Sequence, residues 1–352
     1  MIVDIGGPGN AVLSGGSNLG GYRNEFPELG QDHNLLFLEE PWVTERLPQE
    51  CSSALTEFYV ALRGDPAEAP RKGASLRDEC QLSSTAPSWG FDPNSYSKLV
   101  GAILSREQLR VTGFIGHSWG SVRLTYLKPE VVGPSLDLAW AVLVRPFPVG
   151  VNAAQLVNSQ SSVIAGRTKD VSANGASEVE GRSLPVTYFD YLSAEISRGY
   201  LDDNSFADSV ADMEKYPDQS SLKTIGRLSD AYWKRYGRTS ISPGYLALVQ
   251  ETCAVLGGWT EPFGEIASPR DVLAASFLPC AERQPITGSV RPGNVQTCLV
   301  SSPLDSVVPE KLIKRAYGGT ASTNLAWRTS TQRSHWSVDQ LKECLAEVLE
   351  ET

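Results

Sequence analysis

Residues 111–120 read VTGFIGHSWG, and this stretch decides the fold. The apolar run 111–115 leads directly into 116–120, which matches the pattern G-x-S-x-G, and 121–124 can start a helix. This pattern makes a sharp turn between a buried strand and a helix, and the turn lifts the hydroxyl of Ser118 at the carboxyl end of a sheet. The alternative interpretation is a plain glycine-rich turn with a capping serine.

Other short apolar runs resemble the one before this turn. Buried parallel strands are continuous apolar runs because helices cover both faces of the sheet. Helical patterns separate the runs, one starting after a cap at Asp92 and one spanning 341–349. This order predicts a mostly parallel sheet flanked by helices. The further runs are residues 2–5, 35–38, 138–144 and 295–300.

The middle of the chain has a different character. Residues 188–200, 222–236 and 245–256 have helical patterns, and no strand of comparable strength lies among them. Residues 159–182 are small and polar, which is typical of an irregular loop. A helical block between two sheet strands predicts a lid, and the alternative is an independent helical domain. The predicted division is a first core part at 1–147, a lid insertion at 148–290 and a second core part at 291–352.

Ser118 requires a base, and the base requires an orienting carboxylate, because a serine hydroxyl is a poor nucleophile at neutral pH. At an elbow of this kind the chain order is serine, carboxylate, histidine. His335 is the one histidine downstream of Ser118. Asp305 follows the run 295–300, and the 30 residues from it to His335 leave room for a helix and a strand. The alternatives are Glu310 and Asp339 as the carboxylate, or Asp305 as a residue that only forms a turn.

An oxyanion hole should accompany this triad. Two backbone N–H groups usually stabilise the tetrahedral intermediate, one from the residue after the nucleophile and one from a loop after an earlier strand. Trp119 and the turn at Gly6 and Gly7 occupy these places, and glycines let the backbone approach a substrate closely. The alternative is that Gly6 and Gly7 form an ordinary turn.

The composition narrows the class of protein. Over 352 residues, 41% are hydrophobic and 20% charged, which is typical of a globular chain. The net charge of −10 argues against a nucleic-acid partner. No apolar stretch approaches the roughly 20 residues that span a bilayer. We therefore expect no membrane partner. With three histidines and no C-x-x-C pattern, we also expect no metal centre and no cofactor.

Taken together, these residues resemble a known group of enzymes. The sequence Gly6-Gly7-Pro8-Gly9, the elbow, Asp305 and Ser334-His335 resemble the proline iminopeptidase and tripeptidyl aminopeptidase branch of the α/β-hydrolases. The resemblance covers about 1–147 and 290–352. It implies an α/β-hydrolase fold with an inserted helical lid. It also implies cleavage at peptide N-termini, with lid carboxylates binding the free amine. Candidates for those carboxylates are Glu195, Glu251 and Glu261.

The resemblance bears on the cysteines as well. It implies the pairs Cys51–Cys80 and Cys253–Cys280, by position in secreted relatives. The absence of a secretion signal at the N-terminus leads instead to an expected cytoplasmic location. In the cytosol most of the six cysteines would be free thiols packed as small apolar groups.

The N-terminal residues begin at what would be the third strand of the family. Two missing strands would leave an exposed sheet edge, which invites pairing with another chain. We therefore expect a homodimer or a rearranged N-terminus.

Three functions remain open. The first is a serine hydrolase that cleaves an amide or ester of a small molecule or short peptide by acyl transfer to Ser118, such as an aminopeptidase. The second is an intracellular thioesterase, esterase or acyl-transfer enzyme of a biosynthetic pathway. The third is a non-hydrolytic protein that uses the same scaffold for binding or rearrangement, because fold alone does not fix function.

Overall fold

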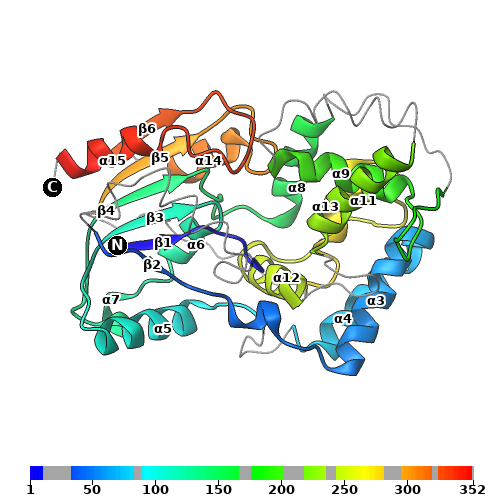
Figure 1. The fold of residues 1–352 in the computed structure, drawn as a ribbon, viewed down its shortest axis with the longest axis horizontal. Coiled ribbons are helices and arrows are strands. Elements are labelled where there is room, and N and C mark those ends of the chain that lie inside the picture. The colour runs from blue at the N-terminus through cyan, green and yellow to red at the C-terminus, as the bar shows by residue number, and fades with distance from the viewer. Residues whose placement is uncertain are drawn as a thin grey trace.

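The computed structural model describes residues 1–10, 33–82, 89–165, 176–200, 218–234, 243–280, 295–318 and 324–350. Within these ranges six parallel strands form one sheet in the order β2-β1-β3-β4-β5-β6 (Figure 1). The strands are β1 (Ile2–Asp4), β2 (Leu36–Phe37), β3 (Val111–His117), β4 (Leu136–Val144), β5 (Gln296–Ser301) and β6 (Leu325–Thr329). The predicted parallel sheet is therefore confirmed, and β6 is the strand for which the interval before His335 leaves room.

Helices cover both faces of the sheet, and the side-chain alternation of the strands decides which residues meet them. On one face, Val3 and Val142 pack with helix α15 (Leu341–Glu350). On the other face, Ile2 and Leu143 belong to a core that includes α5 (Pro93–Arg106), α7 (Pro129–Val132) and α14 (Glu310–Tyr317). Figure 1 shows α15 on one side of the sheet and α5 and α7 on the other.

Helix α5 begins where the sequence predicts. The Asp92 carboxylate accepts from the backbone N–H groups of Asn94 and Ser95, at 2.8 and 3.3 Å. The Ser95 hydroxyl accepts in return from the Asp92 N–H, which completes a capping box. The three backbone N–H groups of Asp92, Asn94 and Ser95, which have no acceptor within the helix, are thereby satisfied.

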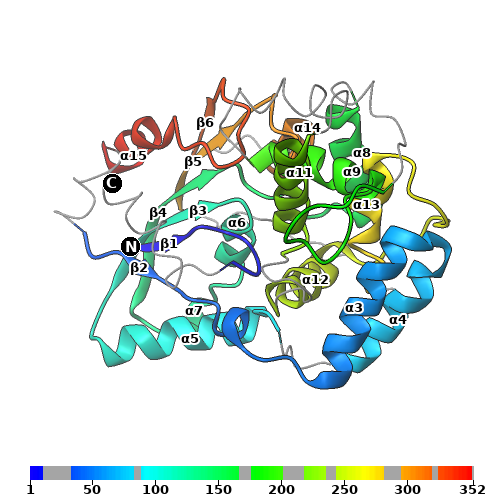
Figure 2. The same ribbon diagram turned by 45° about the vertical axis from the view of Figure 1, so that its right-hand side comes forward.

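A layer of helices lies beyond the carboxyl ends of the strands (Figures 1 and 2). Its members between β4 and β5 are α8 (Ala153–Ile164), α9 (Tyr188–Ser197) with the 3-10 turn η3 (Arg198–Tyr200), α11 (Gln219–Tyr232), α12 (Pro243–Leu256) and α13 (Pro269–Ala275). The three helices predicted in the block correspond to α9, α11 and α12. The irregular loop predicted at 159–182 is wrong for 159–164, which belong to α8 and pack with α13, and 166–175 lie outside the described residues.

Helices from the first part of the chain join this layer. They are η1 (Pro41–Thr44), α3 (Gln49–Gly64), η2 (Pro66–Glu68) and α4 (Ala69–Glu79). Arg63 of α3 forms a buried ion pair with Asp190 of α9 at 2.7 Å, and Tyr59 contacts the rings of Phe189 and Trp233. Figure 2 shows α3 and α4 beside the inserted helices. The division into 1–147, 148–290 and 291–352 stays a prediction, and the structure adds that 49–79 pack with the inserted block.

Three disulfides join elements of the described chain. Cys51–Cys80 joins α3 to the end of α4, and Cys253–Cys280 joins α12 to the segment after α13. Both pairs are those implied by the resemblance. The third, Cys298–Cys344, joins β5 to α15 and was not predicted. The expectation of free thiols is therefore wrong, because all six cysteines are paired. The third pair forms because α15 packs on the sheet, which brings two residues 46 positions apart into contact.

We expect the denatured, unreduced protein to contain no reactive thiol, and the reduced protein to contain six. The loops close over 29, 27 and 46 residues. In the chain-entropy account, each such link lowers the conformational entropy of the unfolded state and so raises its free energy by about 3 kcal/mol or more. Reduction should therefore lower the melting temperature strongly. Thiol titration in guanidinium, on protein exported to an oxidising compartment, checks the pairing, and six thiols before reduction would contradict it.

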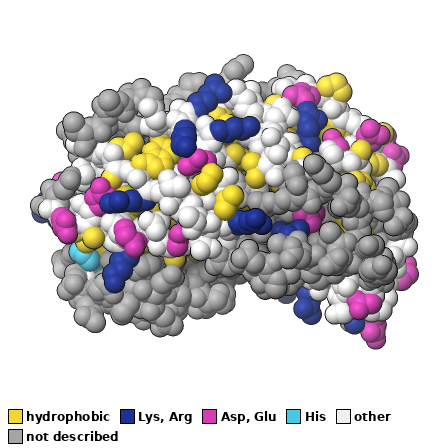
Figure 3. All heavy atoms as spheres, turned by 90° about the horizontal axis from the view of Figure 1, so that it is seen from above, with side chains coloured by type: hydrophobic (Ala, Val, Ile, Leu, Met, Phe, Trp, Pro, Cys, Tyr) yellow, Lys and Arg dark blue, Asp and Glu magenta, His cyan; other side chains and the backbone are white. Residues whose placement is uncertain are grey.

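Other expectations concern the surface. No helix among the described residues has the length and apolar character to cross a membrane. On the face shown in Figure 3, basic side chains are scattered among acidic and neutral ones rather than gathered in one area. Strand β2 forms an edge of the described sheet, and the homodimer expected from an open edge stays a prediction. The expected absence of a nucleic-acid partner also stays a prediction.

Candidate active site

The turn after β3 has the geometry of a nucleophile elbow. Ser118 lies between β3 and helix α6 (Gly120–Leu124), with a φ of +52°. Its N–H donates to the carbonyl of Val144 at 2.9 Å, and its carbonyl accepts from the Ser121 hydroxyl at 2.7 Å. A non-glycine residue adopts this left-handed conformation only when its surroundings hold it there. The elbow predicted from the sequence is thus present, held by β4 and α6.

Gly120 shows why the motif requires small residues. A Cβ atom at this position would lie 2.4 Å from the backbone oxygen of Asp4, on β1. The start of α6 therefore passes directly against the end of the neighbouring strand, and a side chain would push the elbow out of the sheet.

The predicted carboxylate and histidine lie together after β5 and β6. His335 Nδ1 is 2.8 Å from Asp305 Oδ2, and both side chains are buried. The other carboxylate oxygen accepts from the N–H groups of Val307 and Val308 at 2.8 and 3.0 Å. Burial alone would raise the pKa of Asp305, but the charge and hydrogen bond of His335 and the Val308 N–H together hold it below its ordinary value.

The rival carboxylates have other partners. Glu310 accepts from the Ser301 hydroxyl at 2.9 Å and pairs with Lys314. Asp339 accepts from the Ser337 hydroxyl at 3.0 Å. Of the three candidates, Asp305 is the carboxylate with a hydrogen bond to His335.

Ser118 and His335 line the same cavity, which has a volume of about 290 Å³. The Nε2 atom of His335 is buried and has no hydrogen-bond partner in the described part of the chain. This nitrogen is on the side of the ring away from Asp305. It is the atom that a general base would use to accept the proton of the serine hydroxyl.

His117 contacts the backbone of His335 and the ring of Trp336, and so fixes the loop that carries His335. Its Nε2 lies 2.7 Å from the backbone carbonyl of His335, and its ring stacks on Trp336 at 5.0 Å between centroids. Burial, followed by the charge of His335, lowers the pKa of His117 to about 3, so the ring is neutral and donates to that carbonyl. Its side chain does not line the serine cavity. The position of His117 beside Ser118 in the sequence gives no sign of this positioning role.

The predicted oxyanion residues differ in their availability. The N–H of Gly6 donates to Asp4 Oδ1 at 3.0 Å, so this group is already engaged, and the prediction of Gly6 as a donor needs correction. Gly6 instead serves as a spacer, because a Cβ there would lie 2.4 Å from the His117 carbonyl oxygen and 3.0 Å from the Trp119 nitrogen. Gly7 lines the serine cavity. Gly7 and Trp119 therefore remain the candidate pair of donors.

A buried cluster of charged side chains surrounds Arg123 on α6, the helix that follows the elbow. Arg123 of α6 lies 2.6 Å from Glu40, 2.8 Å from Glu251 and 3.6 Å from Asp4, and all four side chains are at most 5% exposed. Glu40 also accepts from the Gly9 N–H at 2.6 Å. The cluster thus ties the elbow to β1, to the glycine turn and to α12. Sequence reasoning missed it, because its members lie far apart along the chain.

Glu251 reaches the elbow itself. Its carboxylate accepts from the Trp119 indole N–H at 2.8 Å and from the Phe91 N–H at 2.9 Å. Burial, assisted by the charge of Glu40 and opposed by that of Arg123, raises the pKa of Glu251 to about 7. One carboxyl of the cluster is therefore protonated for part of the time near neutral pH, which relieves an excess of negative charge around a single arginine.

The carboxylates proposed to bind a peptide amine are all engaged elsewhere. Glu251 is buried and pairs with Arg123 at 2.8 Å. Glu195 pairs with Arg198 at 2.6 Å, and Glu261 pairs with Arg270. None of the three lines the serine cavity, so the structure does not place them where an amine-binding role requires them.

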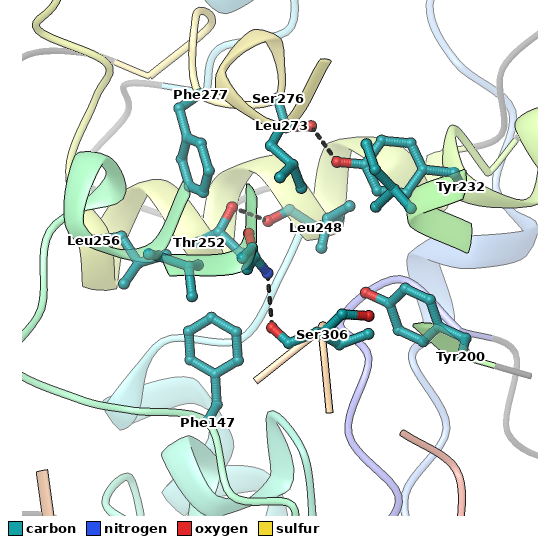
Figure 4. A pocket seen from close by; sticks show the side chains of 14 residues that line it. Phe147, Tyr200, Tyr232, Leu248, Thr252, Leu256, Leu273, Ser276, Phe277 and Ser306 are labelled. Atoms are coloured by element: carbon teal, nitrogen blue, oxygen red, sulfur yellow. Dashed lines mark hydrogen bonds between the residues drawn. The ribbon is translucent and has the colours of Figure 1, made fainter. Parts of the chain in front are cut away.

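A second, apolar cavity of about 80 Å³ adjoins the first, and Tyr200, Tyr232 and Leu248 line both. Figure 4 shows Phe147, Leu256 and Phe277 directed into it, with Tyr200 and Tyr232 together at one end. The N–H of Phe147 donates to the Ser118 carbonyl at 3.1 Å. The wall of this cavity is therefore attached to the elbow.

The parallel sheet, the elbow after β3 and the order Ser118, Asp305, His335 along the chain are the arrangement of the α/β-hydrolase fold. No protein-family model matches the sequence, and no curated protein matches it.

Solved structures similar to this chain include several hydrolases. A mutant of the meta-cleavage product hydrolase CumD from Pseudomonas fluorescens has 11% identity and a TM-score of 0.39, covering 99% of this chain and 89% of its own. A hydrolase from Oleispira antarctica has 12% identity and a TM-score of 0.41, with coverages of 99% and 89%. MenH from S. aureus has 12% identity and a TM-score of 0.38, with coverages of 99% and 93%.

Proposed function

We propose that this protein is a serine hydrolase that cleaves an ester or amide through an acyl intermediate on Ser118. One observation carries the proposal. The buried Asp305–His335 hydrogen bond of 2.8 Å orients a histidine that lines the same cavity as the serine of a nucleophile elbow.

The residues act in the following roles. The Ser118 hydroxyl attacks the substrate carbonyl while His335 Nε2 accepts its proton. The N–H groups of Gly7 and Trp119 stabilise the oxygen that becomes negative in the tetrahedral intermediate. His335 then returns the proton to the leaving group as the carbon–oxygen or carbon–nitrogen bond breaks. Asp305 keeps the Nδ1–H tautomer in place and stabilises the imidazolium.

Deacylation repeats these steps with water. His335 accepts a proton from the water molecule, the resulting hydroxide attacks the acyl carbonyl, and the proton passes to Ser118 Oγ as the acid leaves. The apolar second cavity beside Tyr200 and Tyr232 supports an acyl or leaving group with an aliphatic or aromatic part.

The cavity linings favour an ester or thioester over a peptide N-terminus. Binding a free amine requires a carboxylate in the pocket, and the described lining of the two cavities contains none. The three disulfides are typical of an oxidising compartment. They favour such a location over the cytoplasm that the sequence alone led us to expect.

A fluorophosphonate probe tests the proposal, because it reacts with activated serines. We expect wild-type protein to be labelled, and Ser118→Ala and His335→Ala to remain unlabelled. Ser220→Ala, at an exposed serine on α11, is the matched control and should label like wild type. Absence of labelling in the folded wild type would mean that the triad is idle, and labelling of Ser118→Ala would assign the reactivity to another residue.

A further inference from the structure

One cationic side chain lies in the wall of the serine cavity. Lys234 follows α11 and is 9% exposed. Its Nζ donates to Asn10 Oδ1 at 2.6 Å, and both residues line the cavity together with Ser118 and His335. Asn10 directly follows the glycine turn that supplies Gly7. The two ends of this contact are 224 positions apart in sequence, so only the fold places the ammonium group here.

The charge of this ammonium group is poorly compensated. An ammonium has three donors, and among the described residues it has one hydrogen bond, to a neutral amide oxygen. Burial lowers the pKa of Lys234 to about 8 and the charge of Glu40 acts in the opposite direction, so the group is mostly charged at neutral pH. Glu40 is itself held by Arg123 and the Gly9 N–H.

The other described residues of the cavity wall supply no acidic side chain to balance this charge. A buried cation without an acidic partner is costly to fold. A bound anion in the same cavity would remove that cost and would gain a charge-assisted hydrogen bond.

We propose that Lys234 and Asn10 form a subsite for a carboxylate, and that the substrate carries this carboxylate in addition to the bond cleaved at Ser118. The carboxylate accepts from the ammonium of Lys234 and the side-chain amide of Asn10. The apolar part of the substrate lies toward the second cavity, past Tyr200, Tyr232 and Leu248, which separate the two spaces. The reference to a cleaved bond rests on the proposed function, whereas the anion subsite does not.

A structural role is the competing explanation. Lys234 could simply fix residue 10 to the end of α11. That role predicts that replacing Lys234 weakens charged and neutral ligands equally, whereas a carboxylate subsite predicts a selective loss for the charged ligand.

Binding to the Ser118→Ala protein separates the two explanations without turnover. The probes are 4-phenylbutanoate and 4-phenylbutanamide, which have the same shape and differ in charge. We expect calorimetric titration at pH 7 to show the carboxylate binding at least ten-fold more tightly. Adding Lys234→Met should abolish this preference, and adding Lys234→Arg should retain much of it.

Lys223→Met is the matched control, because Lys223 lies on the outer side of α11 and pairs with Glu180 at 3.2 Å. It should leave the preference intact. Equal affinity for the two probes, absence of binding by both, or a preference that survives Lys234→Met would overturn the subsite.

Hydrolysis by wild-type protein is measured separately, with 4-nitrophenyl butanoate and mono-4-nitrophenyl glutarate. A carboxylate preference in binding with no cleavage of either ester would keep the subsite and refute the proposed hydrolase activity. Cleavage of both esters at equal kcat/KM, with no preference in binding, would keep the hydrolase and refute the subsite.

Discussion

Replacing Ser118 by alanine is expected to lower kcat for 4-nitrophenyl butanoate hydrolysis by about a million-fold, to the level left by binding and the oxyanion hole alone. The physical reason is that the acyl intermediate can no longer form. His335→Ala should have a similar effect, because an unactivated serine hydroxyl is a poor nucleophile. Asp305→Asn should cost about 10⁴-fold, because the amide would favour the wrong tautomer of His335.

The double variant Ser118→Ala/His335→Ala provides the sharper test. Residues that act as one unit have strongly non-additive effects, so the double variant should be no slower than either single variant. Glu310→Gln is the control for Asp305→Asn, since Glu310 is a neighbouring carboxylate that contacts Ser301 and Lys314 instead of His335. A loss of less than ten-fold on Ser118→Ala, with the variant folded, would remove the proposed mechanism.

Arg123→Met is expected to destabilise the protein by about 3–5 kcal/mol, the cost of breaking a buried ionic cluster from one side. The substitution leaves Asp4, Glu40 and Glu251 buried without their shared cation. Urea unfolding followed by circular dichroism measures the change. Arg71→Met is the matched control, because Arg71 pairs with Glu68 at an exposed site, and surface pairs contribute at most about 1 kcal/mol.

The same cluster gives the wild-type protein a pH dependence with an unusual sign for a carboxyl group. The pKa of Glu251 is raised from 4.5 to about 7 in the folded state, so between these values the folded protein holds more protons than the unfolded one. The contribution of Glu251 to the free energy of unfolding therefore decreases as the pH rises from about 4.5 to about 7.

Glu251→Gln isolates this contribution. The amide should be tolerated, because it retains the size of the side chain, and it should flatten the dependence of stability on pH in this window. In Arg123→Met the dependence should become steeper, because three carboxyl groups then resist ionisation. An Arg123→Met protein within 1 kcal/mol of wild type at pH 7 would show that the cluster contributes little.

The sequence by itself determined the sheet and the chemical centre. Strands β1, β3, β4 and β5 are short apolar runs because both of their faces are covered, and this local pattern can be read without knowing which element covers them. The elbow can be read from glycines on either side of Ser118. Since chain order in this fold is fixed, His335 was the one candidate base, and Asp305 followed from its place after a strand.

Only the tertiary structure decided which side chains surround that centre. Arg123 meets Glu40 and Glu251 across 83 and 128 positions, and Lys234 meets Asn10 across 224. It also decided that Cys298 pairs with Cys344, and that the Gly6 N–H is already taken by Asp4. A local pattern reports whether a residue is buried and in which kind of element. Long-range partners depend on how the elements pack together, and no single segment of the chain contains that information.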